Sequence, residues 1–220
     1  ALARLPEVAA IAPNLTVEPV LPIGVRAAPR GPQAVEWNIA RVRADEVWAA
    51  YGITGTGIVV ANIDSGVEYS HDALVRQYRG NLGGATFDHN YNWWDPRGQY
   101  DHPVDTDGHG THVMGISVGE DISRTNQIGL APGARWIASS SGDYSLEHIF
   151  SATQWILAPT DLAGGHADPG KRPHVVNNSW AIFRGSLFLE PLLKSQRAAG
   201  IAVVFAAGNS GDRCGSLRSP

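Results

Sequence analysis

The sequence predicts an α/β fold, a mostly parallel β-sheet with helices on both faces. Beyond residue 34, helix-like stretches alternate with short apolar strands, which is typical of parallel sheets with helical crossovers. Strands such as residues 202–207 are continuously apolar, as burial on both faces requires. With 220 residues, of which 43% are hydrophobic, the chain is long enough to bury one large core. We find no internal repeat.

The N-terminal region differs in composition from the rest of the chain. Residues 1–20 are apolar and interrupted by Pro13-Asn14, which predicts a pair of strands at the end of a small domain. Residues 21–33 then hold three prolines and two glycines among small side chains, which is the composition of a linker. From residue 34 onward the pattern is that of one domain.

Within that domain the hydrophobic pattern predicts each element in turn. The first part has a helix over residues 44–51, a strand over 57–64, a polar excursion over 69–108 rich in Asn, Asp, Gly and aromatics, and a helix over 109–118. The second part has a strand over 135–138, a helix over 145–157, a Pro- and Gly-containing loop, a strand over 174–178, a helix over 187–199 and a strand over 201–207. We assign Trp93, Trp94, Trp136, Trp155 and Trp180 to the core or to the wall of a cleft.

Charge and composition exclude several classes of partner. The net charge is −4 and the pI is near 6.0, with Lys and Arg scattered, so the sequence predicts no nucleic-acid partner and no anionic membrane surface. It has no apolar stretch long enough for a membrane span. Residue 1 is not Met, so we expect that any targeting peptide was removed or not included. The single cysteine, Cys214, forms no internal disulfide; we favour a buried thiol over pairing with a cysteine beyond Pro220.

Two separated segments carry a catalytic pattern. Asp64 closes the apolar run of residues 58–63 and precedes Ser65-Gly66, while His109 opens a helix in Gly108-His109-Gly110-Thr111-His112-Val113. A carboxylate and an imidazole so placed suit the orienting acid and the general base of a serine nucleophile. By itself, an Asp before Ser-Gly is by default a helix cap or a turn residue.

The predicted sheet would bring distant polar residues together. In parallel sheets, ligands gather at the carboxyl ends of the strands. Asp64, Asn178-Ser179 and Asn209 all follow predicted strands, so we expect them to converge on one cleft.

A zinc site is the main alternative at His109. Asp105, Asp107, His89 and His102 are further candidate ligands nearby. However, His109 and His112 are three residues apart with no intervening Glu, unlike the His-Glu-x-x-His motif. We therefore predict no metal ligand, place His112 in the core beneath the site, and interpret Gly108 and Gly110 as room for backbone and substrate to approach the imidazole.

Taken together, the motifs resemble those of subtilases, the subtilisin-like serine peptidases. The matching segments occur in the order of that family: Ile63-Asp64-Ser65-Gly66, Gly108-His109-Gly110-Thr111-His112-Val113, Val176-Asn177-Asn178-Ser179-Trp180 and Ala206-Ala207-Gly208-Asn209-Ser210-Gly211. Further segments resemble its bacillopeptidase F branch: Trp37-Asn38-Ile39, Asn90-Tyr91-Asn92-Trp93-Trp94-Asp95-Pro96, Asn126-Gln127-Ile128-Gly129 and Pro173-His174-Val175-Val176-Asn177-Asn178-Ser179-Trp180. The likeness covers nearly the whole chain.

The resemblance implies a role for each matching position. Asp64 and His109 would be the acid and base of the catalytic triad, and Asn209 would donate to the oxyanion, although an Asn after a strand is otherwise a turn residue. Two extended segments would hold the substrate backbone between them: Ser140, Ser141 and Gly142 on one side, and Ser179, Trp180 and Ala181 on the other. Tyr144 matches a position lining a distal pocket, or is an aromatic at a helix N-terminus. Relatives usually carry Gly at the position of Ala181, so its methyl group is expected to narrow the primary pocket.

The resemblance also implies how the chain is divided. Residues 1–22 would be the end of an inhibitory propeptide, 23–35 a linker with the processing region, and 36–220 the N-terminal two thirds of a catalytic domain. No Gly-Thr-Ser-Met-Ala-like segment occurs before Pro220, so we expect the nucleophile outside these residues and the segment alone to be inactive. A missing C-terminal segment or a second polypeptide would complete the domain.

Three hypotheses of different classes follow. The first is a secreted serine endopeptidase precursor that acts on polypeptides and needs no cofactor for its chemistry; structural calcium is usual among relatives, but Ala73 stands where they often place a ligand carboxylate. The second is a pseudoenzyme or peptide-binding fragment without the serine. The third is a metal hydrolase using His109 and His112. Only the first explains every matching segment.

Overall fold

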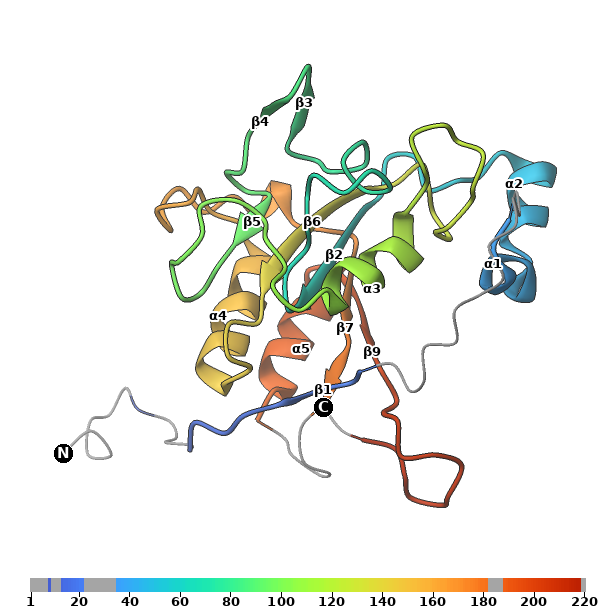
Figure 1. Ribbon diagram of the computed structural model, residues 1–220. Helices are drawn as coiled ribbons and strands as arrows, with labels where there is room; N and C mark the ends of the chain where they lie inside the picture. The colour runs from blue at the N-terminus through green and yellow to red at the C-terminus, as the bar shows by residue number, and fades with distance from the viewer. Residues whose placement is uncertain (1–7, 9–12, 22–34, 182–187, 219–220) are drawn as a thin grey trace.

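A five-stranded parallel sheet forms the centre of the computed structural model, which describes residues 8, 13–21, 35–181 and 188–218 (Figure 1). The strands lie in the spatial order β5 (Trp93–Trp94), β6 (Arg135–Ser140), β2 (Val59–Asp64), β7 (Val175–Asn178), β9 (Ala202–Phe205), and all neighbours are parallel. The α/β prediction is confirmed. The first half of the chain supplies the central strand, β2, which pairs with β6 from Val59↔Arg135 to Asp64↔Ser140.

The two faces of the sheet are covered by different helices (Figure 1). Ala61 and Ile63 of β2 join the core that includes α4 (Leu146–Leu157) and lies against α5 (Glu190–Ala198). The intervening Val60 faces the other core, which contains Met114 and Val118 of α3 (His109–Val118). This alternation follows from the two-residue period of a strand, and because β2 is buried on both faces it is apolar almost throughout.

Most elements expected from the pattern are present. Helices α2 (Ala44–Tyr51), α3, α4 and α5 and strands β2, β6, β7 and β9 lie within a few residues of the expected bounds. The pattern did not predict the short helix α1 (Trp37–Val42), the 3₁₀ turn Pro169–Lys171, strand β5, or the hairpin of β3 (Asn81–Gly83) and β4 (Thr86–Phe87). The last two lie inside the excursion expected to be irregular.

The N-terminal pair of strands expected over residues 1–20 falls largely outside the described residues. Residues 1–7 and 9–12 lie outside the described residues, and β1 (Glu18–Pro19) pairs antiparallel with β8 (Trp180–Ala181). The segment of residues 13–21, which we call the N-terminal segment, therefore lies on the main domain.

Three further expectations can be compared with the structure. Strand β9 is an edge strand within the described sheet, and its residues alternate between exposed and half-buried, with Val204 48% exposed, so two-sided burial is wrong for it. Cys214 is exposed rather than buried. Trp93, Trp136, Trp155 and Trp180 are buried, as expected for core residues. Within the described ranges, no helix combines the length and apolarity that crossing a membrane requires.

Candidate active site

Asp64 provides a buried carboxylate at the carboxyl end of the central strand. It is the last residue of β2, and only 1% of its surface is exposed. Its Oδ1 accepts a hydrogen bond of 2.7 Å from the backbone N–H of Ser65. This hydrogen bond from the residue after the strand fixes the direction in which the Asp64 carboxylate points.

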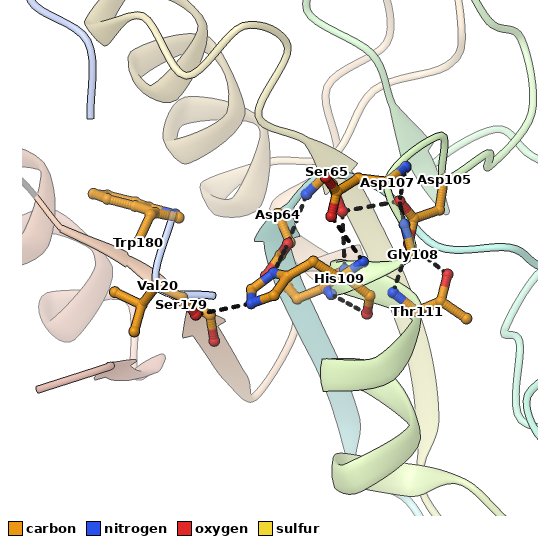
Figure 2. A network of polar contacts seen from close by, with 12 residues as sticks. Val20, Asp64, Ser65, Asp105, Asp107, Gly108, His109, Thr111, Ser179 and Trp180 are labelled. Atoms are coloured by element: carbon orange, nitrogen blue, oxygen red, sulfur yellow. Dashed lines mark hydrogen bonds and ion pairs between the residues drawn. The ribbon is translucent and has the colours of Figure 1, made fainter. Parts of the chain in front are cut away.

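His109 is the first residue of α3, and its Nδ1 lies 2.6 Å from Asp64 Oδ1 (Figure 2). The pair is buried, with 6% of His109 exposed. The hydrogen bond to the Asp64 carboxylate raises the pKa of His109 above its ordinary value, and this effect outweighs burial, which opposes it. An imidazole held in this way keeps the tautomer that a general base needs.

Two glycines beside His109 have different tasks. A Cβ on Gly110 would lie 2.0 Å from the carbonyl oxygen of Gly66 and 3.0 Å from Asp64 Cβ, so only glycine lets α3 approach β2 this closely. Asn62 in β2 donates to the Gly110 carbonyl at 3.1 Å and holds this approach. A Cβ on Gly108 would meet nothing within 4 Å, so space for a neighbouring group, which we expected, is not the reason for glycine here. The reason is its φ of 93°, which glycine adopts without strain.

The N-terminal segment lies along the edge formed by β8 as an added strand. Glu18 pairs with Ala181, and the backbone N–H of Val20 donates to the Ser179 carbonyl at 2.8 Å. Further along, the N–H of Val17 donates to the Tyr144 carbonyl at 2.7 Å, and Val17 is 1% exposed. The chain therefore binds one of its own extended segments mainly through the backbone.

This segment meets the catalytic pair directly. The Val20 carbonyl oxygen lies 2.9 Å from His109 Nε2 (Figure 2). Because this carbonyl and the Asp64 carboxylate can only accept hydrogen bonds, the ring satisfies both contacts with a proton on each nitrogen, as an imidazolium. The carbonyl of the next residue, Leu21, accepts a hydrogen bond from the side-chain amide of Asn209. One dipeptide therefore touches both the imidazole and the amide.

Comparison with known proteins identifies the family of the chain. A family model described as the Subtilase family matches residues 55–220. The chain belongs to the subtilase family. It is 40% identical over 220 residues to Bacillopeptidase F of Bacillus subtilis (strain 168), covering 94% of this chain and 15% of that protein. It is 34% identical over 194 residues to Subtilisin Savinase of Lederbergia lenta, covering 86% of this chain and 60% of that protein.

A solved structure agrees on the fold. Fervidolysin from Fervidobacterium pennivorans, described as a keratinolytic enzyme related to subtilisin, superposes with a TM-score of 0.62 at 20% identity, covering 90% of this chain and 31% of that one. The chain thus spans less than two thirds of the length of each of these subtilases.

The residues expected to bind substrate divide into two groups. Ser179, Trp180 and Ala181 border the N-terminal segment through their backbones, while the Trp180 side chain is buried and donates to the Ile63 carbonyl at 3.0 Å. Tyr144 also contributes its carbonyl, and it precedes the first turn of α4 with a positive φ of 60°.

The other group lies at the end of β6. The N–H of Ser141 donates to the Asp64 carbonyl at 2.6 Å, and Ser140 and Gly142 line a cavity of about 250 Å³ that Arg97 and Gln99 share. Among the described residues, none of these three residues hydrogen-bonds the N-terminal segment. This subtilase therefore holds its own segment from the β8 side, from Tyr144 and from the first turn of α4.

His112 is not beneath the site as expected. It is exposed and lines a cavity of about 540 Å³ on the far side of α3, together with His71. Because Gly110, Met114 and Val118 face the sheet at four-residue spacing, a residue two positions after Gly110 points away from it. Across the described part of the chain, no group of three or more His, Cys, Asp or Glu side chains is placed to hold a metal ion.

Proposed function

We propose that the protein containing these residues is a subtilisin-like serine endopeptidase, which hydrolyses peptide bonds through an acyl-serine intermediate. The observation that supports it most is the buried contact of 2.6 Å between Asp64 and His109, with His109 Nε2 turned toward a peptide carbonyl. Membership of the subtilase family supports the same chemistry.

In this mechanism each residue has one task. His109 takes the proton of the serine alcohol and then gives it to the leaving amine. Asp64 accepts the Nδ1 hydrogen and stabilises the imidazolium formed during acylation. Asn209 donates its amide hydrogen to the developing alkoxide. We infer that the serine lies outside the 220 residues, in the remainder of the same protein or in a second polypeptide, so that this segment alone does not turn over substrate.

Substrate recognition follows from the way the N-terminal segment is bound. An extended peptide would add to β8 as an antiparallel strand and would be held by the Ser179 and Tyr144 carbonyls. Main-chain binding of this kind tolerates many sequences. We therefore propose polypeptides in general, without a narrow motif, as the substrates.

Ala181 is the position that we expect to limit this tolerance. It is buried and lines a cavity of about 250 Å³ that also reaches Asn209. In the complete enzyme, Ala181→Gly should raise kcat/KM about fourfold for a bulky residue on the acyl side of the cleaved bond, since one methylene is worth about 0.8 kcal/mol. A substrate with Ala at that position is the internal control. Equal rates for small and bulky residues in the unaltered enzyme would contradict the idea.

We further propose that residues 1–22 end an inhibitory propeptide and that residues 23–35 contain the processing region. The N-terminal segment supports this because it occupies the β8 edge and takes the Nε2 position of His109. A secreted zymogen would be kept inactive in this way until the segment is cut and released.

The test uses the complete protein and the 220-residue chain side by side. A fluorophosphonate probe, which labels activated serines, and a casein substrate should both report activity for the complete protein once its N-terminal segment has been cut and released, and His109→Ala should abolish both signals. The 220-residue chain should give neither signal. Hydrolysis by a homogeneous preparation of the 220-residue chain would contradict the missing nucleophile, and a complete protein that binds peptides without cleaving them would be a peptide-binding pseudoenzyme instead.

A further inference from the structure

We propose that Asp105 is a positioning residue, whose single carboxylate fixes the imidazole of His109 against Asp64. The proposal rests on the proposed function, in which His109 is the general base. In the sequence, Asp105 stood out only as a candidate metal ligand, and neither its spacing nor its neighbours indicated this task.

The Asp105 carboxylate accepts five hydrogen bonds (Figure 2). Its Oδ1 accepts from Ser65 Oγ at 2.9 Å, from the N–H of Asp107 at 3.1 Å and from the N–H of Gly108 at 2.9 Å. Its Oδ2 accepts from the N–H of Thr111 at 2.8 Å and from Thr111 Oγ1 at 2.6 Å. Both carboxylate oxygens of Asp105 therefore accept hydrogen bonds.

These donors come from the two parts of the chain that carry the catalytic pair. Ser65 follows Asp64 directly, whereas Gly108 and Thr111 flank His109 on either side. A second connection joins the same two parts of the chain. Ser65 Oγ donates to Asp105 and also accepts a hydrogen bond of 2.9 Å from the N–H of Gly110. The acid and the base are thus tied together through their neighbours as well as through their own hydrogen bond.

The charge of Asp105 suits this place. Burial would raise the pKa of its carboxyl, but the hydrogen bonds from Thr111, Gly108 and Ser65 outweigh burial and lower it, so the group is ionised at neutral pH. An ionised carboxylate also satisfies N–H groups in the first turn of α3 that have no partner within the helix. His109 is therefore held at the start of a helix whose first turn is fixed in place.

Loosening this arrangement should displace the imidazole by a fraction of an ångström to an ångström. Displacements of this size reduce the rate of the chemical step strongly and affect binding little, because substrate is held by other parts of the cleft. In the complete enzyme we therefore expect Asp105→Asn to lower kcat about 100-fold with KM nearly unchanged.

A charge-preserving pair of variants separates positioning from the electrostatic effect of the carboxylate. Ser65→Ala and Thr111→Val each remove one hydroxyl donor and no charge. Nitrogen-15 NMR of the 220-residue chain should show the pKa of His109 falling toward its ordinary value in both, with faster solvent exchange of the Nδ1 hydrogen. Asp105→Asn should show a larger change in the same direction.

Asp121→Asn is the matched control. The Asp121 carboxylate likewise accepts several hydrogen bonds, from Ser123, Thr125 and Asn126, but in a separate exposed loop. The Asp121→Asn substitution should leave the pKa of His109 and the solvent exchange of its Nδ1 hydrogen unchanged. A purely structural role for Asp105 would lower thermal stability while His109 titrates and exchanges as before in Ser65→Ala and Thr111→Val, and that result would overturn the proposal. Because the NMR readout needs no nucleophile, it decides on Asp105 even if the complete protein proves not to be a peptidase.

Discussion

The two halves of the proposed catalytic site are built differently. The acid–base half, Asp64 and His109, is buried between the central strand β2 and helix α3. The proposed oxyanion half, Asn209, is exposed in the loop after the edge strand β9, and its side chain contacts the Leu21 carbonyl of the N-terminal segment. One half is fixed by the fold, and the other is held by what occupies the cleft.

The cause of this difference lies in the sheet. Strand β2 has a neighbour on each side, so the residue at its end is surrounded by ordered backbone. Strand β9 has only β7 beside it among the described strands, and the residues that follow it are largely exposed. An exposed amide gains little stability from its position and is easily reoriented. Changes in the first half should therefore affect folding and chemistry together, and changes in the second half chemistry alone.

Asp64→Asn should produce the largest effect. The amide keeps the shape of the carboxylate but no longer stabilises the imidazolium, and in serine-peptidase triads this exchange costs about 10⁴-fold in kcat. Because the site is buried, the mispaired amide should also lower the free energy of unfolding by about 1–3 kcal/mol. Steady-state hydrolysis by the complete enzyme and urea unfolding measure the two effects. Unchanged unfolding would show that the acid–base half is not fixed by the fold.

Asn209→Ala should separate chemistry from stability. Loss of the corresponding donor in subtilisin lowers kcat about 10²–10³-fold, and we expect the same range for the complete enzyme. Because Asn209 is exposed, the free energy of unfolding should stay within about 0.5 kcal/mol. The same two measurements apply. A loss of stability as large as that of Asp64→Asn would remove the distinction between the two halves.

The buried half was also the more predictable from sequence. The apolar run before Asp64 and the Gly-His-Gly-Thr-His segment indicated a strand end and a helix start, and a parallel sheet brings such ends to one edge. The main helices and strands followed from hydrophobic period in the same way, because burial on one face leaves a local pattern.

Features that depend on distant partners were not predictable. The pairing of residues 18–19 with residues 180–181 has no local signal, since antiparallel partners can come from anywhere in the chain. The exposure of β9 and Cys214 likewise depends on what lies beside them and not on their own composition. Asp105 was missed for a related reason: a carboxylate in a Gly- and Asp-rich loop looks the same in sequence whether it binds a metal, a helix terminus or water.

A pair of glycine substitutions in α3 tests how tightly the buried half is packed. Gly110→Ala would place a methyl group 2.0 Å from the Gly66 carbonyl, so the helix must move away from β2, at a cost of about 1–3 kcal/mol in the free energy of unfolding. Gly115→Ala in the same helix meets nothing within 4 Å and should stabilise by about 0.5–1 kcal/mol. Thermal and urea unfolding of the two variants give the comparison. Equal effects would mean that close helix–strand contact does not hold His109.

The smallest expected effect is the pH dependence of the stability of the folded chain, in which His109 contacts the N-terminal segment. The pKa of His109 is raised above 6.5 in the folded chain, chiefly by its hydrogen bond to Asp64, and the Val20 carbonyl contributes in the same direction. The folded state therefore holds this proton more tightly than the unfolded chain, so the stabilisation is complete below about pH 6.5 and is lost as pH rises through the raised pKa. In the same window the imidazole becomes a free base, so the contact that blocks it weakens as the base becomes competent.

The measurement is the thermal unfolding midpoint between pH 6 and pH 9, for the 220-residue chain and for His109→Gln. Glutamine cannot take up the proton, so the part of the pH slope that belongs to His109 should vanish in the variant, while the contributions of the other seven histidines remain. Identical slopes would show that the segment binds without regard to the protonation of His109. A steeper slope in the unaltered chain would show that the folded state holds this proton through the contacts of His109 with Asp64 and Val20.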